Sequence, residues 1–276
     1  MSRPQSKEPR SGGRRLALML SVAFGLVLAA PGPVRAETEV DLALVLAVDV
    51  SRSMDSDEQR LQRDGFVEAF RSPLVHDAIR KGVVGRIAVT YVEWSGMDQQ
   101  RVVMPWTVVD GPQGAAAFSD KLASLPIGVI FSTSISGAID FSVGHFEKSG
   151  VDPLRRVIDI SGDGPNNTGR MVTLARDEAV AKGITINGLP FMLKRPSGRG
   201  EIEDLDLYYR DCVIGGPGSF IVPLRERDQF AEAVRTKLMR EIAGVIEPEP
   251  LVQKAQDRER ANCLIGESLR RQQWGP

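Results

Sequence analysis

The chain contains the stretch Val40-Asp41-Leu42-Ala43-Leu44-Val45-Leu46-Ala47-Val48-Asp49-Val50-Ser51-Arg52-Ser53. Residues 40–48 are almost all Val, Leu and Ala, a composition typical of a strand buried on both faces inside a parallel sheet. Open α/β folds bind ligands at the carboxyl ends of such strands. Asp49, Ser51 and Ser53 occupy alternate positions there, and alternate residues of an extended chain point to one side. The stretch therefore predicts hard oxygen ligands gathered for a small divalent cation.

The rest of the chain alternates strands with helices. We expect further strands at 86–94, 101–106, 155–161, 184–189 and 220–224, and helices at 57–71, 74–81, 111–124, 136–148, 173–182, 204–212 and 226–243. The 101–106 strand should pair with 86–94 at the sheet edge, and Ser56 with Gln59 should form the capping box of the first helix. The alternation predicts an α/β fold, a doubly wound, mostly parallel sheet with helices on both faces.

Composition favours one large globular domain with a mildly acidic surface. The 276 residues are 42% hydrophobic and 26% charged, which is enough apolar material for an independent core. Residues 1–36 hold six basic side chains and one acidic, so the remainder carries 29 basic and 35 acidic side chains, a net charge of −6. An acidic body argues against nucleic acid as the partner and suits a cation-binding protein.

The N-terminus has the three parts of a secretory signal peptide. A basic stretch through Arg15 precedes the apolar run 16–30, and Val34-Arg35-Ala36 supplies the cleavage pattern after Ala36. The run has 15 residues, short of the roughly 20 that span a bilayer. We expect 1–36 to be removed, leaving a periplasmic or secreted protein without a membrane span. An uncleaved anchor is the alternative.

Two cysteines, Cys212 and Cys263, bear on the C-terminal tail. In an oxidising compartment two such cysteines often form a disulfide, which here would pin the tail to the domain, and two independent buried thiols are the alternative. Glu247-Pro248-Glu249-Pro250 reads as a stiff break. We therefore divide the mature chain into a domain at 37–246 and a tail at 247–276, with one helix expected around 253–260.

Three segments together resemble a von Willebrand factor A domain with its metal-ion-dependent adhesion site. They are Asp49-Val50-Ser51-Arg52-Ser53, the Thr133 segment 132–139, and Ile160-Ser161-Gly162-Asp163-Gly164. The resemblance covers about residues 40–244, and segment 208–218 further resembles an uncharacterised bacterial branch of secreted A-like domains. Phe131-Ser132 stands where the family has a glycine, so Ser132 and Ser134 are alternatives to Thr133.

The resemblance implies a metal site and a binding function. Ser51, Ser53 and Thr133 would be direct ligands, while Asp49 and Asp163 would orient waters or coordinate at a remove. Mg²⁺ suits this set of oxygens, with Mn²⁺ or Ca²⁺ as alternatives. A carboxylate from a partner protein would complete the coordination. We therefore expect an adhesion-type protein-binding module and not an enzyme.

Other interpretations of the same residues remain open. Asp49 and the two serines could cap the turn and helix that follow, and Asp163 could be ordinary turn chemistry. An enzyme is the main rival, either a metal-dependent hydrolase or a phosphotransferase that uses Asp49, although the latter would need a second carboxylate where Ser51 stands. A structural A-like domain without metal is the third. Trp94, expected to end its strand near the metal face, could pack in the sheet or line a partner surface.

Overall fold

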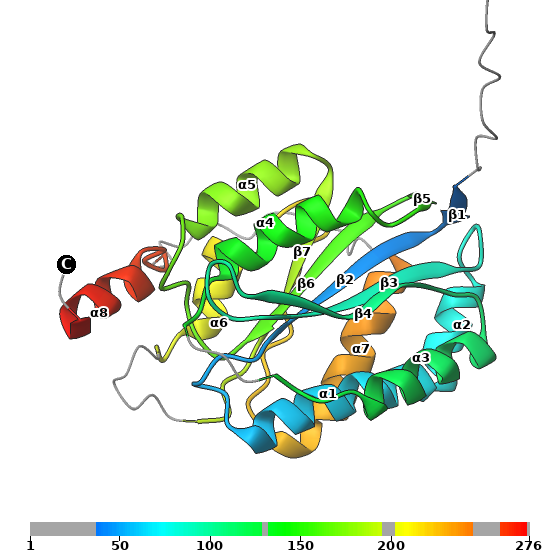
Figure 1. Ribbon diagram of the computed structural model, residues 1–276, viewed down its shortest axis with the longest axis horizontal. Coiled ribbons are helices and arrows are strands. Elements are labelled where there is room, and N and C mark those ends of the chain that lie inside the picture. The colour runs from blue at the N-terminus through cyan, green and yellow to red at the C-terminus, as the bar shows by residue number, and fades with distance from the viewer. Residues whose placement is uncertain (1–36, 129–131, 195–201, 245–259, 275–276) are drawn as a thin grey trace, which may run out of the picture. The chain divides into compact units, whose positions relative to one another are not determined.

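The computed structural model describes residues 37–128, 132–194, 202–244 and 260–274. Its main sheet has five strands in the order β4-β3-β2-β6-β7 (Figure 1). Their bounds are β2 Leu42–Asp49, β3 Ile87–Trp94, β4 Gln100–Val109, β6 Arg156–Gly162 and β7 Ile184–Pro190. All neighbours pair in parallel except β4, which runs antiparallel to β3 at the edge. The expected α/β fold and its antiparallel edge strand are confirmed.

Helices cover both faces of this sheet (Figure 1). On one face lie α4 and α5, and on the other lie α1, α2, α3 and α7. The bounds are α1 Ser56–Arg71, α2 Pro73–Arg80, α3 Pro112–Ser124, α4 Ile135–Phe146, α5 Val172–Ala181, α6 Leu205–Tyr208, π-helix η1 Tyr209–Val213, 3₁₀-helix η2 Arg227–Gln229, α7 Phe230–Ala243 and α8 Ile265–Trp274. A short parallel pair, β1 Thr38–Val40 with β5 Val151–Pro153, completes the strands. No helix in these described ranges is long and apolar enough to cross a membrane.

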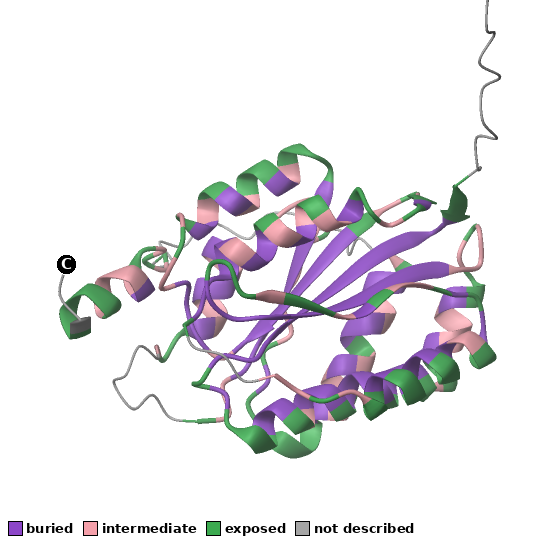
Figure 2. Ribbon diagram, viewed as in Figure 1, coloured by how far each residue is buried: buried purple, intermediate pink, exposed green. Residues whose placement is uncertain are grey.

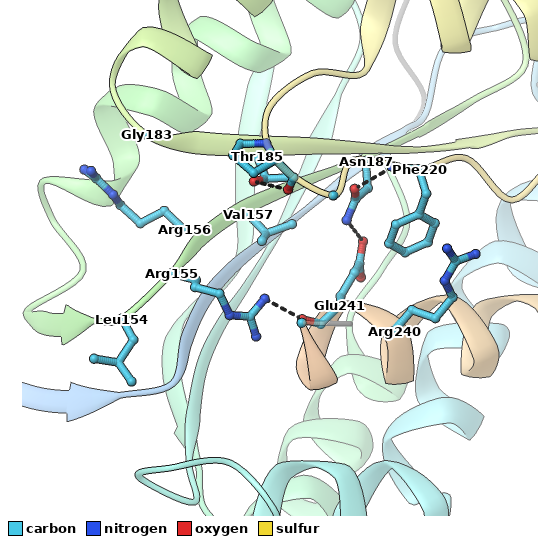
Figure 3. Close-up of a pocket in the computed structure, with 13 residues that line it drawn as sticks. Leu154, Arg155, Arg156, Val157, Gly183, Thr185, Asn187, Phe220, Arg240 and Glu241 are labelled. Atoms are coloured by element: carbon cyan, nitrogen blue, oxygen red, sulfur yellow. Dashed lines mark hydrogen bonds between the residues drawn. The ribbon is translucent and has the colours of Figure 1, made fainter. Parts of the chain in front are cut away.

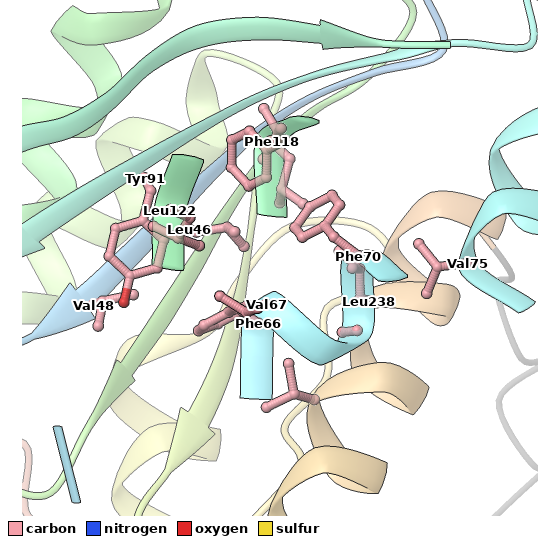
Figure 4. Close-up of a cluster of buried hydrophobic side chains, with 14 of the residues drawn as sticks. Leu46, Val48, Phe66, Val67, Phe70, Val75, Tyr91, Phe118, Leu122 and Leu238 are labelled. Atoms are coloured by element: carbon pink, nitrogen blue, oxygen red, sulfur yellow. The ribbon is translucent and has the colours of Figure 1, made fainter. Parts of the chain in front are cut away.

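The central strand β2 is buried along its whole length, as its apolar sequence predicts (Figure 2). Because its side chains alternate, Leu44 and Leu46 join the core against α1 and α7, while Val45 and Ala47 join the core against α4 and α5. Phe66 and Phe70 bring α1 onto the first core (Figure 4). Burying each large apolar side chain contributes about 2 kcal/mol, so the two cores fix β2 and the turn that follows it.

The first helix begins one residue earlier than the sequence analysis predicts. Asp55 is the N-cap, because its side chain accepts hydrogen bonds from the backbone N–H groups of Asp57 and Glu58 at 2.9 and 2.8 Å. In return, the Asp55 N–H donates to Glu58 Oε2. The prediction of Ser56 with Gln59 is therefore wrong. A carboxylate is as good an N-cap acceptor as a hydroxyl, and a Glu at N3 closes the box equally well.

Segment 220–224 is not the strand that was expected. Its described pairings are isolated bridges, one of Ile221 with Gly188 in β7 and one of Leu224 with Phe191, the residue that follows β7. The N–H groups of Val222 and Leu224 donate to the carbonyls of Gly188 and Pro190. Pro190 has no N–H to donate to the Val222 carbonyl, which accounts for the interruption of the ladder.

The two chain ends give different outcomes for the sequence predictions. The expected signal peptide and residues 253–259 of the expected tail helix lie outside the described residues. The tail does contain a described helix, α8, which the sequence analysis did not anticipate. The structure joins Cys212 to Cys263 in a disulfide, so the bridge that the sequence favoured is present.

Candidate metal centre

The candidate metal residues lie where β2 and β6 end side by side. The two strands pair in parallel, with Val48 opposite Ser161, so the turns that follow them begin at the same edge of the sheet. Asp49 is the last residue of β2, and Asp163 comes directly after Gly162, the last residue of β6. Two aspartates that are 114 positions apart in the sequence are therefore neighbours in the fold.

A chain of hydrogen bonds connects these two aspartates through the serines. The Ser51 backbone N–H donates to Asp49 Oδ1 at 2.7 Å. The hydroxyls of Ser51 and Ser53 are 2.9 Å apart, and Ser53 Oγ donates to Asp163 Oδ1 at 2.7 Å. Asp49 and Ser51 are buried, whereas Ser53 is exposed, so the chain of oxygens runs from the interior to the surface. The structure thus brings four of the five proposed metal residues into one cluster.

The carboxylate of Asp49 is buried, and only part of it is hydrogen-bonded by the described residues. It has no exposed surface, and its Oδ2 atom has no hydrogen-bond partner among the residues that the structure describes. Burial raises the pKa of Asp49 well above its usual range, and the charge of Asp163 raises it further. Hydrogen bonds from Ser51 and from the Asp163 backbone act in the opposite direction but do not cancel these effects. A cation beside Asp49 would satisfy the oxygen and relieve the repulsion between the carboxylates.

Gly162 and Tyr209 enclose the inner side of this carboxylate. A Cβ atom on Gly162 would lie 2.8 Å from Asp49 Oδ2 and 3.0 Å from Tyr209 Oη, so only glycine fits between them. Tyr209 is fully buried, and its hydroxyl has no hydrogen-bond partner in the described part of the chain. Burial raises the pKa of Tyr209, and the charges of Asp49 and Asp163 raise it further. Sequence reasoning missed Tyr209 as a site residue. The available signal was its place in segment 208–218, which carried only a resemblance.

Thr133 lies beside the loop that carries Asp163. Its backbone N–H donates to Asn167 Oδ1 at 3.2 Å, and its carbonyl accepts hydrogen bonds from the backbone of Asn167 and Thr168. Ser134 caps α4 by accepting from the Gly137 N–H, and it also donates to the Thr168 carbonyl. Because these bonds occupy the Ser134 hydroxyl, Thr133 remains the better candidate ligand in this segment.

The residue before Thr133 adopts a backbone conformation that favours glycine. Ser132 has φ of 76°, and no other non-glycine residue in the described ranges has a positive φ. This is the position where the resembled family has glycine and this chain does not. The local backbone requirement is therefore met by a serine, at some cost in strain.

The donor set fits a hard divalent cation. It combines the carboxylates of Asp49 and Asp163 with the hydroxyls of Ser51 and Ser53, all of them oxygen ligands of the kind that Mg²⁺, Mn²⁺ and Ca²⁺ prefer. In the described part of the chain, no three His, Cys, Asp or Glu side chains gather in a group that could hold a metal. A metal here would consequently depend on the serine hydroxyls.

Two cavities help to locate the site. One, of about 500 Å³, is lined by Asp163 together with Lys194 and Arg225, and so borders the cluster on the side of β7. The other, of about 250 Å³, lies where β6 and β7 begin and is lined by Arg155, Thr185 and Glu241 (Figure 3). This second cavity is at the opposite end of the strands from Asp49.

Trp94 does not face a partner. It is fully buried in the core against α4, because β3 lies inside the sheet. The suggestion that it could line a binding surface is therefore wrong.

Solved structures share this fold at low sequence identity. The SpaC pilus adhesin of Lactobacillus rhamnosus GG is 10% identical with a TM-score of 0.54, over 75% of this chain and 31% of that one. The von Willebrand factor domain of the type V pili tip protein Mfa5 from Porphyromonas gingivalis is 10% identical with a TM-score of 0.51, over 78% and 99%. A von Willebrand factor type A protein from Catenulispora acidiphila is 13% identical with a TM-score of 0.50, over 75% and 43%.

The matches differ in how much of each relative they span. This chain covers less than half of the SpaC and Catenulispora structures. No curated protein sequence matches the chain. A family profile described as "Protein of unknown function (DUF1194)" matches residues 39–246. The chain therefore belongs to the DUF1194 family and has the fold of a von Willebrand factor A domain.

Proposed function

We propose that this protein is a secreted, metal-dependent binding module that recognises an acidic group on a partner protein through a divalent cation. The proposed metal residues are Asp49, Ser51, Ser53, Thr133 and Asp163. The observation that carries the proposal is Asp49 Oδ2, a fully buried carboxylate oxygen without a hydrogen-bond partner among the described residues, on the side chain whose Oδ1 begins the chain of bonds through Ser51 and Ser53. Buried polar atoms in folded proteins almost always have a hydrogen-bond partner or an ion beside them, and a divalent cation would fill this role for Asp49.

The charge of the cluster favours a cation that keeps room for another ligand. Two carboxylates balance one divalent ion, and the remaining ligands are neutral hydroxyls. Mg²⁺ usually retains several waters when only one or two carboxylates hold it, and such waters can be replaced by an incoming oxygen. The exposed side chain of Ser53 and the partly exposed Asp163 place the open side of the cluster at the molecular surface.

Adhesion-type recognition is supported by the structural relatives. SpaC is a pilus adhesin and Mfa5 is a pilus tip protein. Because their sequence identity to this chain is only 10%, the shared fold supports the proposal without assigning a partner. The proposed export through a signal peptide at 1–36 agrees with the Cys212–Cys263 disulfide, since structural disulfides are typical of oxidising compartments.

Metal binding is tested directly by titrating the protein with Mn²⁺ and measuring free Mn²⁺ by electron paramagnetic resonance. We expect one site in the wild type and loss of binding in Ser51→Ala and Asp163→Asn. Ser56→Ala and Asp64→Asn are matched controls, because both residues are exposed on α1 outside the cluster. Wild-type protein without a Mn²⁺ site would leave a structural domain as the better interpretation.

Recognition of an acidic group is tested on the Mn²⁺-loaded protein. A peptide containing Glu should lower the water-proton relaxation rate by displacing a metal-bound water, whereas the same peptide with Gln should not. EDTA should abolish the difference. Equal responses to the two peptides would argue against carboxylate recognition while leaving metal binding intact.

A further inference from the structure

The C-terminal segment, residues 260–274, is fixed to the domain beside the candidate metal centre. Cys263 forms the disulfide with Cys212 in η1, and the Ala261 N–H donates to Asp211 Oδ2 at 2.9 Å. Figure 1 shows α8 beyond α6, at the left of the view. The segment lies outside the residues 39–246 that the family profile matches, so the family gives it no role.

The helix α8 touches the loop that follows Asp163. A Cβ atom on Gly266 would overlap the carbonyl oxygen of Asn166 and lie 3.1 Å from Pro165 Cγ, so the two backbones are in direct contact. Glu267 Oε1 accepts a hydrogen bond from Asn166 Nδ2 at 2.8 Å. The second oxygen, Glu267 Oε2, is buried without a hydrogen-bond partner within the described ranges. Burying a carboxylate oxygen is unfavourable unless hydrogen bonds compensate for the lost water, and the bond from Asn166 provides such compensation for Glu267.

Asn166 connects this helix to the rest of the site. It is fully buried, its N–H donates to Tyr208 Oη at 3.1 Å, and its Oδ1 accepts from the Ser136 N–H at 3.0 Å. One side chain therefore joins α8, the start of α4 and the loop after β6. The next residue of this loop, Asn167, accepts a hydrogen bond from the Thr133 N–H. The loop 163–168 thus connects the C-terminal segment to two of the proposed metal residues. It contains Asp163, and its Asn167 contacts Thr133.

We infer that the C-terminal segment positions the metal centre, with Glu267 acting through Asn166 to fix loop 163–168. The inference rests on the metal-binding function proposed above. Glu267 is a positioning residue, because its described partner is Asn166 and not a proposed ligand. Groups that orient metal ligands from outside the coordination shell commonly change metal affinity by about 10- to 100-fold.

The test compares the Mn²⁺ affinity of Glu267 variants in the full-length protein. Glu267→Ala should weaken binding by about 10-fold, because the Asn166 Nδ2 amide loses the shorter of its two hydrogen bonds and keeps only the one to the Arg170 carbonyl. Glu267→Gln keeps an amide oxygen at the same position and should restore affinity to within about twofold of wild type. Gln272→Ala, an exposed change on the same helix, is the control. Wild-type affinity in Glu267→Ala would overturn the inference.

Hydrogen exchange separates this inference from the metal proposal. In Glu267→Ala, the amides of Ser136, Asn166 and Asn167 should exchange faster than in wild type, with or without metal. Faster exchange in a protein that binds no Mn²⁺ would refute the proposed function and still support the positioning of the loop. Unchanged exchange at all three amides would refute the positioning, whatever the metal result.

Discussion

Two acidic clusters lie along strand β6 and differ in how their negative charge is balanced. We call the cluster of Asp49, Ser51, Ser53 and Asp163 the edge cluster, and the cluster of Asp159, Lys237 and Glu241 the internal cluster. Asp163 follows the strand and meets Asp49 through the two serines. Asp159, inside the strand, lies beneath α7 with Glu241, and there the protein supplies its own cation. Lys237 Nζ lies 2.7 Å from Asp159 Oδ1 and also forms an ion pair with Glu241. All three side chains are buried.

In both clusters a buried carboxylate lies near a second carboxylate, but different groups stabilise its charge. Burial and a neighbouring carboxylate raise the pKa of Asp159 to about 7, and Lys237 opposes the rise. The same two causes raise the pKa of Asp49, but the opposing groups there are hydrogen bonds from Ser51 and from the Asp163 backbone. Asn187 completes the internal cluster by donating to Glu241 Oε1 at 2.9 Å (Figure 3). The internal cluster is thus closed by a lysine, whereas the edge cluster is suited to an ion from solution.

Removing the internal cation should have the largest effect on stability. Lys237→Met leaves Asp159 and Glu241 buried without their ammonium partner, and breaking a buried ion pair costs about 3–5 kcal/mol. Urea unfolding at pH 7 should show this loss. Adding Glu241→Gln to Lys237→Met should recover part of it, because the second carboxylate is then neutral. A single variant as stable as wild type would show that Lys237 does not balance this cluster.

The edge cluster should gain stability from an added cation. A divalent ion at 100 times its dissociation constant stabilises a folded protein by about 2.7 kcal/mol. We expect this gain for the wild type and none for Asp49→Asn, measured as the shift in urea unfolding with Mn²⁺. In metal-free solution Asp49→Asn should be at least as stable as wild type, since it removes a buried charge. Equal Mn²⁺ stabilisation of both proteins would place the ion elsewhere.

The pH dependence should distinguish the clusters. Because the folded-state pKa values of Asp49 and Asp159 lie above their unfolded values, the folded protein binds protons more tightly. Metal-free stability should therefore fall as pH rises from about 4 toward the raised pKa values. Mg²⁺ should offset the part due to Asp49, so its stabilising effect should be larger at pH 8 than at pH 5.

Asp159→Asn provides the control for that experiment. It should remove the part of the pH slope that ends near pH 7, and it should leave the Mg²⁺ effect unchanged. If Asp159→Asn abolished the Mg²⁺ effect, the two clusters would not be independent, and their contrast would fail.

The sequence contained the features that are set locally or by burial. The apolar run before Asp49 was enough to identify the central strand, because a strand buried on both faces has few polar residues. The alternate spacing of Asp49, Ser51 and Ser53 also identified a cluster at its end, since extended residues two apart share a side. The resemblance then added Asp163, whose approach to Ser53 depends on the pairing of β2 with β6.

The features that the sequence did not reveal depend on distant contacts. Glu267 reaches Asn166 across 101 positions, and the turn pattern around Asn166 gives no indication of this contact. Tyr209 becomes part of the site because η1 places it against Gly162. The two alternatives for Trp94 could not be separated from the sequence, because its burial depends on α4 packing over β3. Nothing in the sequence singled out Lys237, because its burial with Asp159 follows from how α7 lies on the sheet.

The smallest expected effect concerns backbone strain, which is found beside the edge cluster. Ser132, next to Thr133, has φ of 76°, a conformation that costs a non-glycine residue about 1–2 kcal/mol. Ser132→Gly relieves this cost but adds entropy to the unfolded chain, so a net stabilisation of about 0.5–1 kcal/mol is expected in urea unfolding. Ser124→Gly, in the last turn of α3, should instead be destabilising.

The Mn²⁺ affinity of Ser132→Gly tests whether the backbone strain at Ser132 contributes to metal binding. Glycine keeps the same backbone conformation available, so Thr133 should stay in place and Mn²⁺ affinity should remain within about twofold of wild type. A loss of affinity together with the gain in stability would mean that the stiffness of serine holds the loop for the ion, which is how strain at a binding site can serve function. Destabilisation by Ser132→Gly would mean that residue 132 does not adopt the left-handed conformation in solution. The position of Thr133 in the structure would then no longer support its assignment as the fifth proposed metal residue.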